Sequence, residues 1–425
     1  MILEFRVRNF RSFKGESVLS LVASKDRSLA GTNTIQTHNS SLPRALRAAV
    51  IYGANASGKS NLIRALQLMR GVVLESAASQ PNHMFNVQPF RLDQKSAAEP
   101  TFFEVTVLLD GTRYQYGFEF ISAKIISEWL LVYQKSKPQK WFYRKIGIND
   151  SKDTFEFGPH LLGAKRVWQE ATRPNALFLS TAVQLNSESL APLYNWFSET
   201  LKVFLDGGQI SPDFSTGLIQ TVTGQNKITS LLSRADIAIK AISAVPTKGY
   251  KQSITFDPLK GTADTKLEEA ELLLPRFKHT IDSVSADFEL SDESQGTQKL
   301  FALAGPILDI LEHGRILVID ELDRSLHPLL VRQIIDTFQN PDLNCNGAQL
   351  IFTTHDTSQL DTTLLRRDQI WLTEKRRNHS SELVPLMEFS PRKSEALEKG
   401  YLSGRYGGVP VIATQLIDES DCAER

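Results

Sequence analysis

The segment GANASGKS, residues 53–60, constrains the fold of this chain more than any other part of its sequence. The apolar run 46–52 (LRAAVIY) before it is typical of a buried strand, and 60–70 (SNLIRALQLMR) after it has the apolar spacing of a helix. A strand, a glycine-rich turn and a helix in this order form a phosphate-binding loop. The sequence therefore predicts a parallel sheet with an anion site where the helix begins.

The residue types of this loop suit phosphate and magnesium. Gly53 and Gly58 let backbone N–H groups point inward around phosphates, and the helix N-terminus adds partial positive charge. Lys59 is expected to reach the β- and γ-phosphates of ATP, and Ser60 to give its hydroxyl oxygen to Mg²⁺. Further loop residues expected to bind the nucleotide are Asn55, Ser57 and Asn61.

A second motif supplies two acids. The strand expected at 315–320 ends in Asp320, and Glu321 follows. Asp320 is expected to hold the Mg²⁺ shell, and Glu321 to act as the general base for the attacking water. By itself this pair would be an exposed strand end, but its combination with Lys59 and Ser60 favours the catalytic interpretation.

Two further segments carry candidate phosphate contacts. SQGTQK, residues 294–299, opens a helix with Ser294 and Gly296, where backbone N–H groups can bind an anion. A plain helix N-cap is the alternative. The strand expected at 349–354 is followed by His355, which we expect to contact the γ-phosphate, although a lone histidine is more often a surface or core residue.

In this order the motifs resemble the ABC-type ATPase heads of SMC and RecF proteins. GANASGKS is similar to their Walker A motif, ILVIDE to Walker B, SQGTQK to a variant signature motif and His355 to the switch histidine. LDRSLHP, with Asp323, resembles the D-loop, and NFRSF resembles the N-terminal segment whose basic residue, here Arg11, touches nucleotide. The resemblance implies an ATPase that dimerises with nucleotide between its heads. The signature residues of one subunit would then face the nucleotide on Lys59 of the other.

The sequence resembles even more closely a bacterial family of stand-alone AAA-type ATPases linked to abortive infection and anti-phage defence. This resemblance implies a homo-oligomer that controls a separate effector protein, such as a nuclease. The sequence segments that support this resemblance span most of the chain: IYGANASGKSNL, RPNALFLS, DELDRSLHP, LIFTTHDTSQL, LRRDQIWLTEK and YLSGRYGGVP.

The sequence also departs from the wider superfamily. SQGTQ replaces the LSGGQ of transporters, which argues against a transporter. The interval between Ser60 and Ser294 is long but contains no heptads, so an SMC coiled coil is not expected. Gln88 is a candidate for the glutamine that senses Mg²⁺, and a turn before Pro89 is an equally good interpretation.

Two other functions compete with a defence ATPase for this sequence. An in-chain nuclease would need an acidic cluster after His355, and the acids of DESDC at the extreme end are more typical of a solvated tail. A RecF-like repair ATPase that binds DNA is the alternative to a defence ATPase. It would use the basic clusters at 364–367, 375–377 and 392–393, each of which a solvated face also explains.

The expected fold is an α/β ABC-type head with a parallel sheet, an antiparallel lobe and a helical insertion. Residues 1–184 would form its first part, with a hairpin at Asp110–Gly111. Residues 185–285 would be the helical insertion, with a loop within 245–268, and residues 286–425 would complete the head. The segment 401–410 is expected to be an ordered turn that either caps the sheet or exposes a contact surface. The residues at the centre of that surface would be Tyr401, Arg405 and Tyr406.

Composition adds limits on the setting of the protein. Lys plus Arg and Asp plus Glu both number 48, so net charge gives no general attraction to nucleic acid or to an anionic membrane. The two cysteines indicate a reducing compartment. Without a signal peptide or a long apolar stretch, we expect a cytoplasmic location and no membrane partner.

Overall fold

The structure is a computed structural model in which two compact units are distinguished. The first comprises Met1–Leu205, Gly314–Asp320 and Ile335–Arg425, and the second Asp206–His313 and Glu321–Ile334. The described residues are 1–39, 42–147, 153–205, 210–257, 262–391 and 395–410, with backbone alone in 251–257 and 262–268. Within these ranges, no helix is long and apolar enough to cross a lipid bilayer.

The first unit contains a six-stranded, mostly parallel sheet. Its strands are, in spatial order, β11 (Leu201–Phe204), β15 (Ile316–Ile319), β16 (Gln349–Thr353), β5 (Ala48–Gly53), β17 (Ile370–Lys375) and β18 (Ser381–Pro385). Neighbours run parallel except in the antiparallel β17–β18 hairpin. β5, β15 and β16 are buried along their whole length, as strands covered on both faces are. The strands that the sequence predicts at 46–52, 315–320 and 349–354 are confirmed.

The same unit contains a seven-stranded antiparallel sheet. Its strands are, in spatial order, β10 (Thr154–Phe157), β9 (Gln139–Lys145), β8 (Lys124–Tyr133), β7 (Thr112–Ile121), β6 (Thr101–Leu109), β1 (Ile2–Arg8) and β2 (Ser17–Ser20). Between β6 and β7, Asp110 and Gly111 have φ of 47° and 76°. Two positive φ angles are what a two-residue hairpin turn requires. The predicted hairpin and the antiparallel lobe are therefore confirmed.

Helix α1 (Lys59–Glu75) follows β5 and buries the apolar face that its sequence spacing predicts. One hydrophobic cluster contains residues of this face, such as Leu66, together with Phe103 of the antiparallel sheet and Val318 of the parallel one. Smaller elements of this unit are β3 (Thr34–Asn39), β4 (Leu42–Leu46), α2 (Gln94–Ala98), α3 (Lys165–Ala171), α4 (Phe178–Gln184), α5 (Ala191–Asn195) and α10 (Leu397–Leu402).

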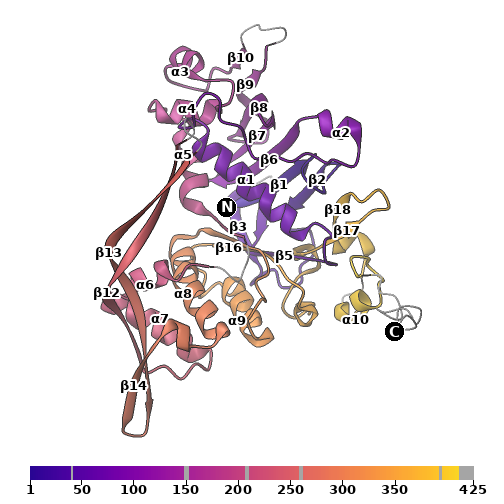
Figure 1. Ribbon diagram of the computed structural model, residues 1–425. Helices are drawn as coiled ribbons and strands as arrows, with labels where there is room; N and C mark the ends of the chain where they lie inside the picture. Colours follow the sequence, from indigo (N-terminus) through magenta and orange to yellow (C-terminus); the bar gives the residue numbers. More distant parts are fainter. Residues whose placement is uncertain (40–41, 148–152, 206–209, 258–261, 392–394, 411–425) are drawn as a thin grey trace, which may run out of the picture. The chain divides into compact units, whose positions relative to one another are not determined.

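The second unit combines helices with a three-stranded antiparallel sheet. Its helices are α6 (Asp213–Leu218), α7 (Val222–Arg234) and α8 (Gln295–His313), and its strands are β12 (Ala241–Asp257), β13 (Thr262–Ile281) and β14 (Val284–Glu289). Figure 1 shows β12 and β13 as long paired arrows. Helix α9 (Pro328–Gln339) includes residues of both units. The helix that the sequence predicts to begin within SQGTQK, residues 294–299, is confirmed as α8.

The insertion expected to be helical over 185–285 is helical only in part. Residues 201–204, predicted as helix, form β11 and pair with β15, so tertiary pairing overrides their local helical spacing. Helix α7 ends at Arg234, two residues before Asp236 with φ of 60°, and the chain then enters β12. The stretch 245–268, predicted to contain a loop, is strand in its described residues, and residues 258–261 between β12 and β13 lie outside the described part of the chain.

Candidate functional site

The loop between β5 and α1 is closed so tightly that only glycine fits at two of its positions. Gly53 and Gly58 have φ of 154° and 120°. A Cβ at Gly53 would lie 2.2 Å from the Thr373 hydroxyl, and one at Gly58 would lie 2.5 Å from the Ser381 hydroxyl. The β17–β18 hairpin therefore forms a wall against this loop. Ser57 Oγ and Thr373 Oγ1, 2.5 Å apart, form a further hydrogen bond between the two.

Lys59, the first residue of α1, lies over this loop. Its side chain is buried, and Nζ donates hydrogen bonds to the carbonyl oxygens of Gly53 at 2.7 Å and Ala54 at 3.2 Å. Ser60 is half-buried beside it and Asn55 is exposed. A fixed ammonium next to the N–H groups of a helix N-terminus is a phosphate-binding arrangement.

Asp320 lies at the same edge of the parallel sheet as this loop. It follows β15, which pairs with β16, and β16 pairs in turn with β5, which leads into the loop. The Asp320 side chain is buried, and its Oδ1 accepts a hydrogen bond of 2.6 Å from Thr353 Oγ1. The carboxyl edge of a parallel sheet is where α/β proteins bind ligands. Asp320 and Ser60 both offer the oxygen ligands that Mg²⁺ prefers, so their chemistry fits this ion.

His355 is exposed at this edge, two residues after β16 ends. The backbone around it is tied to β5, because Thr354 N donates to Ile51 O at 3.3 Å and Tyr52 OH donates to Asp356 O at 3.0 Å. The edge thus carries Lys59, Asp320 and His355, three of the residues that the sequence assigns to phosphate or metal in this unit.

A basic pocket of about 350 Å³ lies beside the phosphate loop. Its lining includes the predicted nucleotide residues Arg11 and Asn61 and the candidate metal residue Gln88, and Asp320 is not part of it. Arg11 N donates to Gln88 O at 2.7 Å, and Asn61 Nδ2 donates to Ser12 Oγ at 2.9 Å. Burial and the charge of Arg64 lower the pKa of Arg11.

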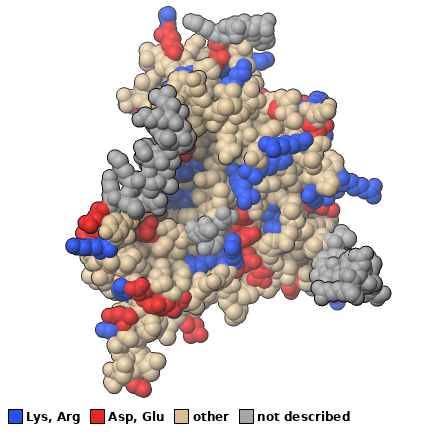
Figure 2. Space-filling view, in the orientation of Figure 1, with Lys and Arg blue, Asp and Glu red and all other residues tan. Residues whose placement is uncertain are grey.

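Three further cationic or titratable side chains of this pocket were missed by the sequence analysis as site residues: Arg91, Lys375 and His379. Figure 2 shows Lys and Arg side chains gathered on the visible face over α1 and the β17–β18 hairpin. Lys375 belongs to a basic cluster seen in the sequence, but no local pattern connects Arg91 or His379 with the phosphate loop.

The predicted signature residues begin α8 in the second unit. Ser294 Oγ accepts a hydrogen bond of 3.2 Å from Thr297 N, so this serine caps the N-terminus of α8, as the alternative interpretation predicts. A Cβ at Gly296 would lie 3.1 Å from Ser325 O, so this position closely approaches another backbone segment. Capping leaves the phosphate role of Ser294 a prediction.

The general-base candidate, Glu321, also belongs to the second unit, although Asp320 directly precedes it in the chain. Glu321 has φ of 53°, and its Oε2 lies 3.6 Å from Arg324 Nη1. The D-loop candidate Asp323 accepts a hydrogen bond from Leu326 N at 3.0 Å through its carbonyl oxygen. These residues form a short turn after the acidic strand.

Comparison with known proteins shows the family of this chain. Residues 48–361, from β5 through the segment after His355, match the family described as AAA domain, putative AbiEii toxin, Type IV TA system. The chain belongs to this family. It is therefore an ATPase of the AAA type, with a phosphate loop and an acid at the edge of its parallel sheet. None of the curated proteins matches the sequence.

Solved structures similar to this AAA ATPase include heads of SMC proteins. One is the SMC head domain from Thermotoga maritima, at 14% identity and a TM-score of 0.42, covering 90% of this chain and 98% of that chain. Another is an SMC head bound to the C-terminal winged-helix domain of ScpA, at 11% identity and a TM-score of 0.40, covering 90% of this chain and 96% of that chain.

The tyrosines of segment 401–410 are not the exposed rings that one interpretation of the sequence predicts. Tyr401 and Tyr406 are both buried. Tyr401 packs against Tyr52 of β5 with ring centroids 5.7 Å apart, and its hydroxyl donates to Gly408 O at 3.0 Å. Arg405 is exposed and pairs with Glu395 at 2.7 Å. The segment thus packs on the sheet of the AAA domain, as the capping interpretation predicts.

One of the three basic clusters considered for DNA is also internal. Arg366 is buried and pairs with Asp368 at 2.6 Å, and Arg367 pairs with Asp26 at 2.5 Å. Arg366 is thus engaged inside the protein and the half-buried Arg367 is paired with an acid, so the solvated-face interpretation does not fit this cluster. The cluster at 392–393 lies outside the described residues.

Proposed function

We propose that this AAA ATPase is a nucleotide-gated switch whose subunits assemble with ATP between them. The observation that carries the proposal is the common edge of the parallel sheet, where Lys59 is fixed over its loop and Asp320 is held by Thr353. A site built this way binds a triphosphate through backbone N–H groups and one ammonium.

Each residue of the edge has a separate task in hydrolysis. Lys59 binds the β- and γ-phosphates, and Gly53, Ser57 and Gly58 shape the loop around them. Ser60 and Asp320 would hold Mg²⁺, which neutralises charge on the phosphate oxygens when it is bound. Glu321 takes the proton of the attacking water, and His355 contacts the γ-phosphate.

The basic pocket beside the loop is proposed to take the rest of the nucleotide. Arg11 and Asn61 line it next to Ala56 of the phosphate loop, which supports a role for them in binding the α-phosphate and the nucleoside. A metal role for Gln88 has less support, because Gln88 lines this pocket with Arg11 and its backbone is bonded there.

Assembly is proposed to complete the site. Ser294 and Gly296 open α8, a helix long enough for its N-terminal N–H groups to attract an anion. In a pair of subunits these groups, together with Asp323, would face the nucleotide held by Lys59 of the partner. Residues 1–184 and 286–425 would then act as one ATPase head, and nucleotide binding would stabilise the closed pair.

The output is proposed to be control of a separate effector, such as a nuclease, in defence against phage. Support comes from the family description, which names a putative abortive-infection toxin and a type IV toxin–antitoxin system. The coupling of assembly to hydrolysis gives such a protein an on state and an off state that ATP can set.

The test compares Glu321→Gln with Lys59→Ala and the wild type. We expect Glu321→Gln to bind ATP, hydrolyse it at least about a hundredfold more slowly and accumulate an ATP-dependent dimer or larger assembly. Lys59→Ala should show neither ATP binding nor assembly while melting near the wild-type temperature. Light scattering after gel filtration reports the mass. Normal hydrolysis by Glu321→Gln would show that Glu321 is not the general base. A particle mass that is the same with and without ATP would contradict the proposal that ATP controls assembly.

A DNA-binding repair ATPase is the second candidate, favoured by the exposed cluster at 375–377. Binding of duplex DNA would be measured with and without ATP between low and physiological salt. Lys375→Ala with Arg377→Ala should weaken a genuine interaction and reduce its salt dependence, since each phosphate contact contributes to the slope of log affinity against log salt. Indifference to DNA at low salt would exclude this candidate.

A further inference from the structure

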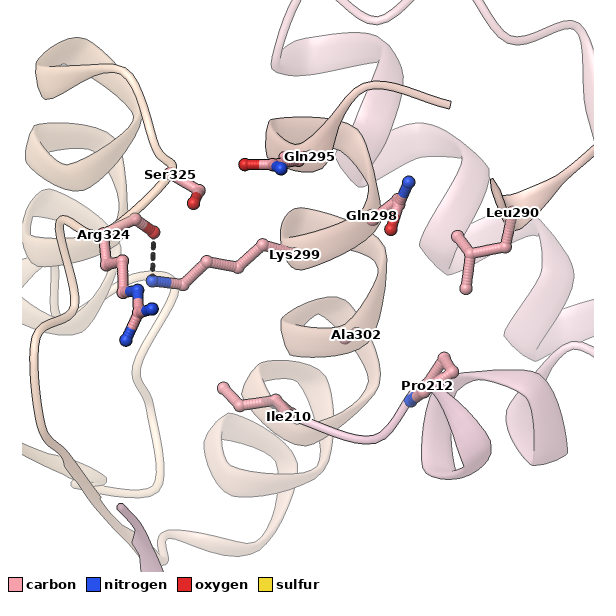
Figure 3. Close-up of a pocket in the computed structure, with 9 residues that line it drawn as sticks. All are labelled: Ile210, Pro212, Leu290, Gln295, Gln298, Lys299, Ala302, Arg324 and Ser325. Atoms are coloured by element: carbon pink, nitrogen blue, oxygen red, sulfur yellow. Dashed lines mark hydrogen bonds between the residues drawn. The ribbon is translucent and has the colours of Figure 1, made fainter. Parts of the chain in front are cut away.

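A buried lysine of α8 holds the backbone turn that follows Asp320. Lys299 is 6% exposed, and its Nζ donates to the carbonyl oxygens of Glu321 at 3.2 Å, Leu322 at 3.0 Å and Arg324. Figure 3 shows the side chain reaching from the helix to the Arg324 carbonyl. An ammonium has three N–H donors, so this single turn can occupy all of them.

The turn at residues 321–324 needs stabilising contacts from outside it. Glu321 has φ of 53°, a left-handed conformation that is uncommon for residues with a side chain and is kept only where the surroundings impose it. Arg324 N donates to Glu321 O at 3.1 Å, which closes the turn. Lys299 adds a charged donor to the same oxygen and to two later ones. Charge-assisted hydrogen bonds are stronger than neutral ones, so Lys299 tethers this turn more strongly than neutral backbone hydrogen bonds would.

The tether leads directly to the start of α8. Lys299 lies just over one helical turn after Ser294 and one turn after Gly296. Gly296 itself meets the same segment, because a Cβ there would lie 3.1 Å from Ser325 O. The first turns of α8 and residues 321–325 are therefore in contact at two points, one polar and one steric.

Burying this cation has a cost that its electrostatic surroundings reduce only in part. Burial lowers the pKa of Lys299 to about 8, Asp323 and Glu321 act to raise it, and Arg324 acts to lower it. A charged side chain that stays buried despite this cost is typical of positions where it holds neighbouring groups in a fixed arrangement for function. The pocket of about 400 Å³ beside it is lined by Gln295, Gln298 and Ala302 of the same helix.

We propose that Lys299 is a positioning residue for ATP hydrolysis, which ties the Glu321 turn to the helix that begins with Ser294 and Gly296. Movement of this helix on nucleotide then shifts the backbone that carries the base. The proposal rests on the role of Glu321 put forward above. It assigns a function to the last residue of the SQGTQK segment, which the nucleotide contacts leave unexplained.

The test uses Lys299→Met, which keeps a side chain of similar length and removes its charge. Lys299→Arg is compared with it, and Lys227→Met is the control. Lys227 is a half-exposed lysine of α7 in the same unit, paired with Glu312. For Lys299→Met we expect kcat to fall about tenfold or more while KM for ATP stays within about twofold, as for a residue that acts only in the chemical step. Lys299→Arg should lie between, since it keeps a cation but presents a planar fork. Lys227→Met should match the wild type.

Hydrogen exchange supplies a readout that does not depend on turnover. Amides of residues 322–327 should exchange faster in Lys299→Met than in the wild type, while amides of α7 stay unchanged. Wild-type kcat together with wild-type exchange in Lys299→Met would overturn the proposal. If Lys299→Met does not fold, the same two measurements on Lys299→Arg decide, and wild-type values there overturn it. Glu321→Gln assayed in parallel separates the outcomes, because normal turnover by that variant contradicts the proposed function itself.

Discussion

Thr353 Oγ1 donates a hydrogen bond of 2.6 Å to Asp320 Oδ1, which joins the ends of two neighbouring parallel strands, β16 and β15. Both residues are buried. The bond fixes one carboxylate oxygen of the acid expected to hold Mg²⁺. Removing a partner that orients a metal-binding carboxylate typically costs about 10–100-fold in metal affinity or activity.

We therefore expect Thr353→Val to weaken magnesium-dependent turnover. The substitution keeps the shape of the side chain and leaves Asp320 without this donor, so half-maximal activity should need about tenfold more Mg²⁺. A magnesium titration of the ATPase rate measures it. Thr181→Val, a buried threonine of α4 whose hydroxyl bonds to Leu177 O within its own helix, is the matched control. An unchanged magnesium dependence would show that this hydrogen bond does not prepare the metal site.

If each ATP site combines the phosphate loop of one subunit with the signature residues of another, a mixture of two inactive variants should regain activity. A Lys59→Ala subunit lacks the phosphate loop cation, and a Ser294→Arg subunit presents a bulky signature residue. Each should be inactive alone. Because a mixed dimer contains one intact combination of the two motifs, mixing should restore up to about a quarter of wild-type activity for random pairing. No recovery, with both variants folded and the mixture forming an ATP-dependent dimer, would place both motifs in one subunit's own site.

The segment 401–410 should matter for stability and not for assembly. Tyr406→Ala removes a ring that is 1% exposed, and truncation of a buried aromatic costs about 3–5 kcal/mol of unfolding free energy. Arg405→Ala removes an exposed member of an ion pair and should change stability by less than about 1 kcal/mol. Urea denaturation measures both. A stable Tyr406→Ala variant with an assembly defect would restore the interface interpretation.

Lys299 should make activity and stability respond to pH in opposite directions. Its pKa is lowered by burial from 10.5 to about 8 in the folded protein. Between these two values the unfolded chain holds a proton that the folded protein has released, so the folded state gains stability as the pH rises through this window. Loss of the proton also removes one donor from the turn at Glu321, so kcat should fall over the same range. Lys299→Arg should lack both effects in melting and rate profiles from pH 7 to pH 10.

Local sequence determined the chemistry of this protein. Gly53, Gly58 and Lys59 stand at fixed spacing between a strand and a helix, and this spacing alone forms the phosphate loop. Asp320 and His355 follow buried apolar strands, and parallel strands end at one edge of a sheet, so their place beside the loop follows from the pattern. The hairpin at Asp110–Gly111 is likewise encoded in two residues that accept positive φ.

Tertiary structure decided which residues support that chemistry. Thr353, Thr373 and Ser381 touch Asp320 or the phosphate loop only because distant strands pair, and no spacing rule in the sequence joins them. Residues 201–204 became β11 because an open edge beside β15 was available. Contacts of this kind depend on burial against partners far along the chain, where packing outweighs intrinsic propensities of less than about 1 kcal/mol per residue. The same packing buried Tyr406, which one interpretation of the sequence places in an exposed contact surface, and it turned Lys299 toward the backbone after Asp320.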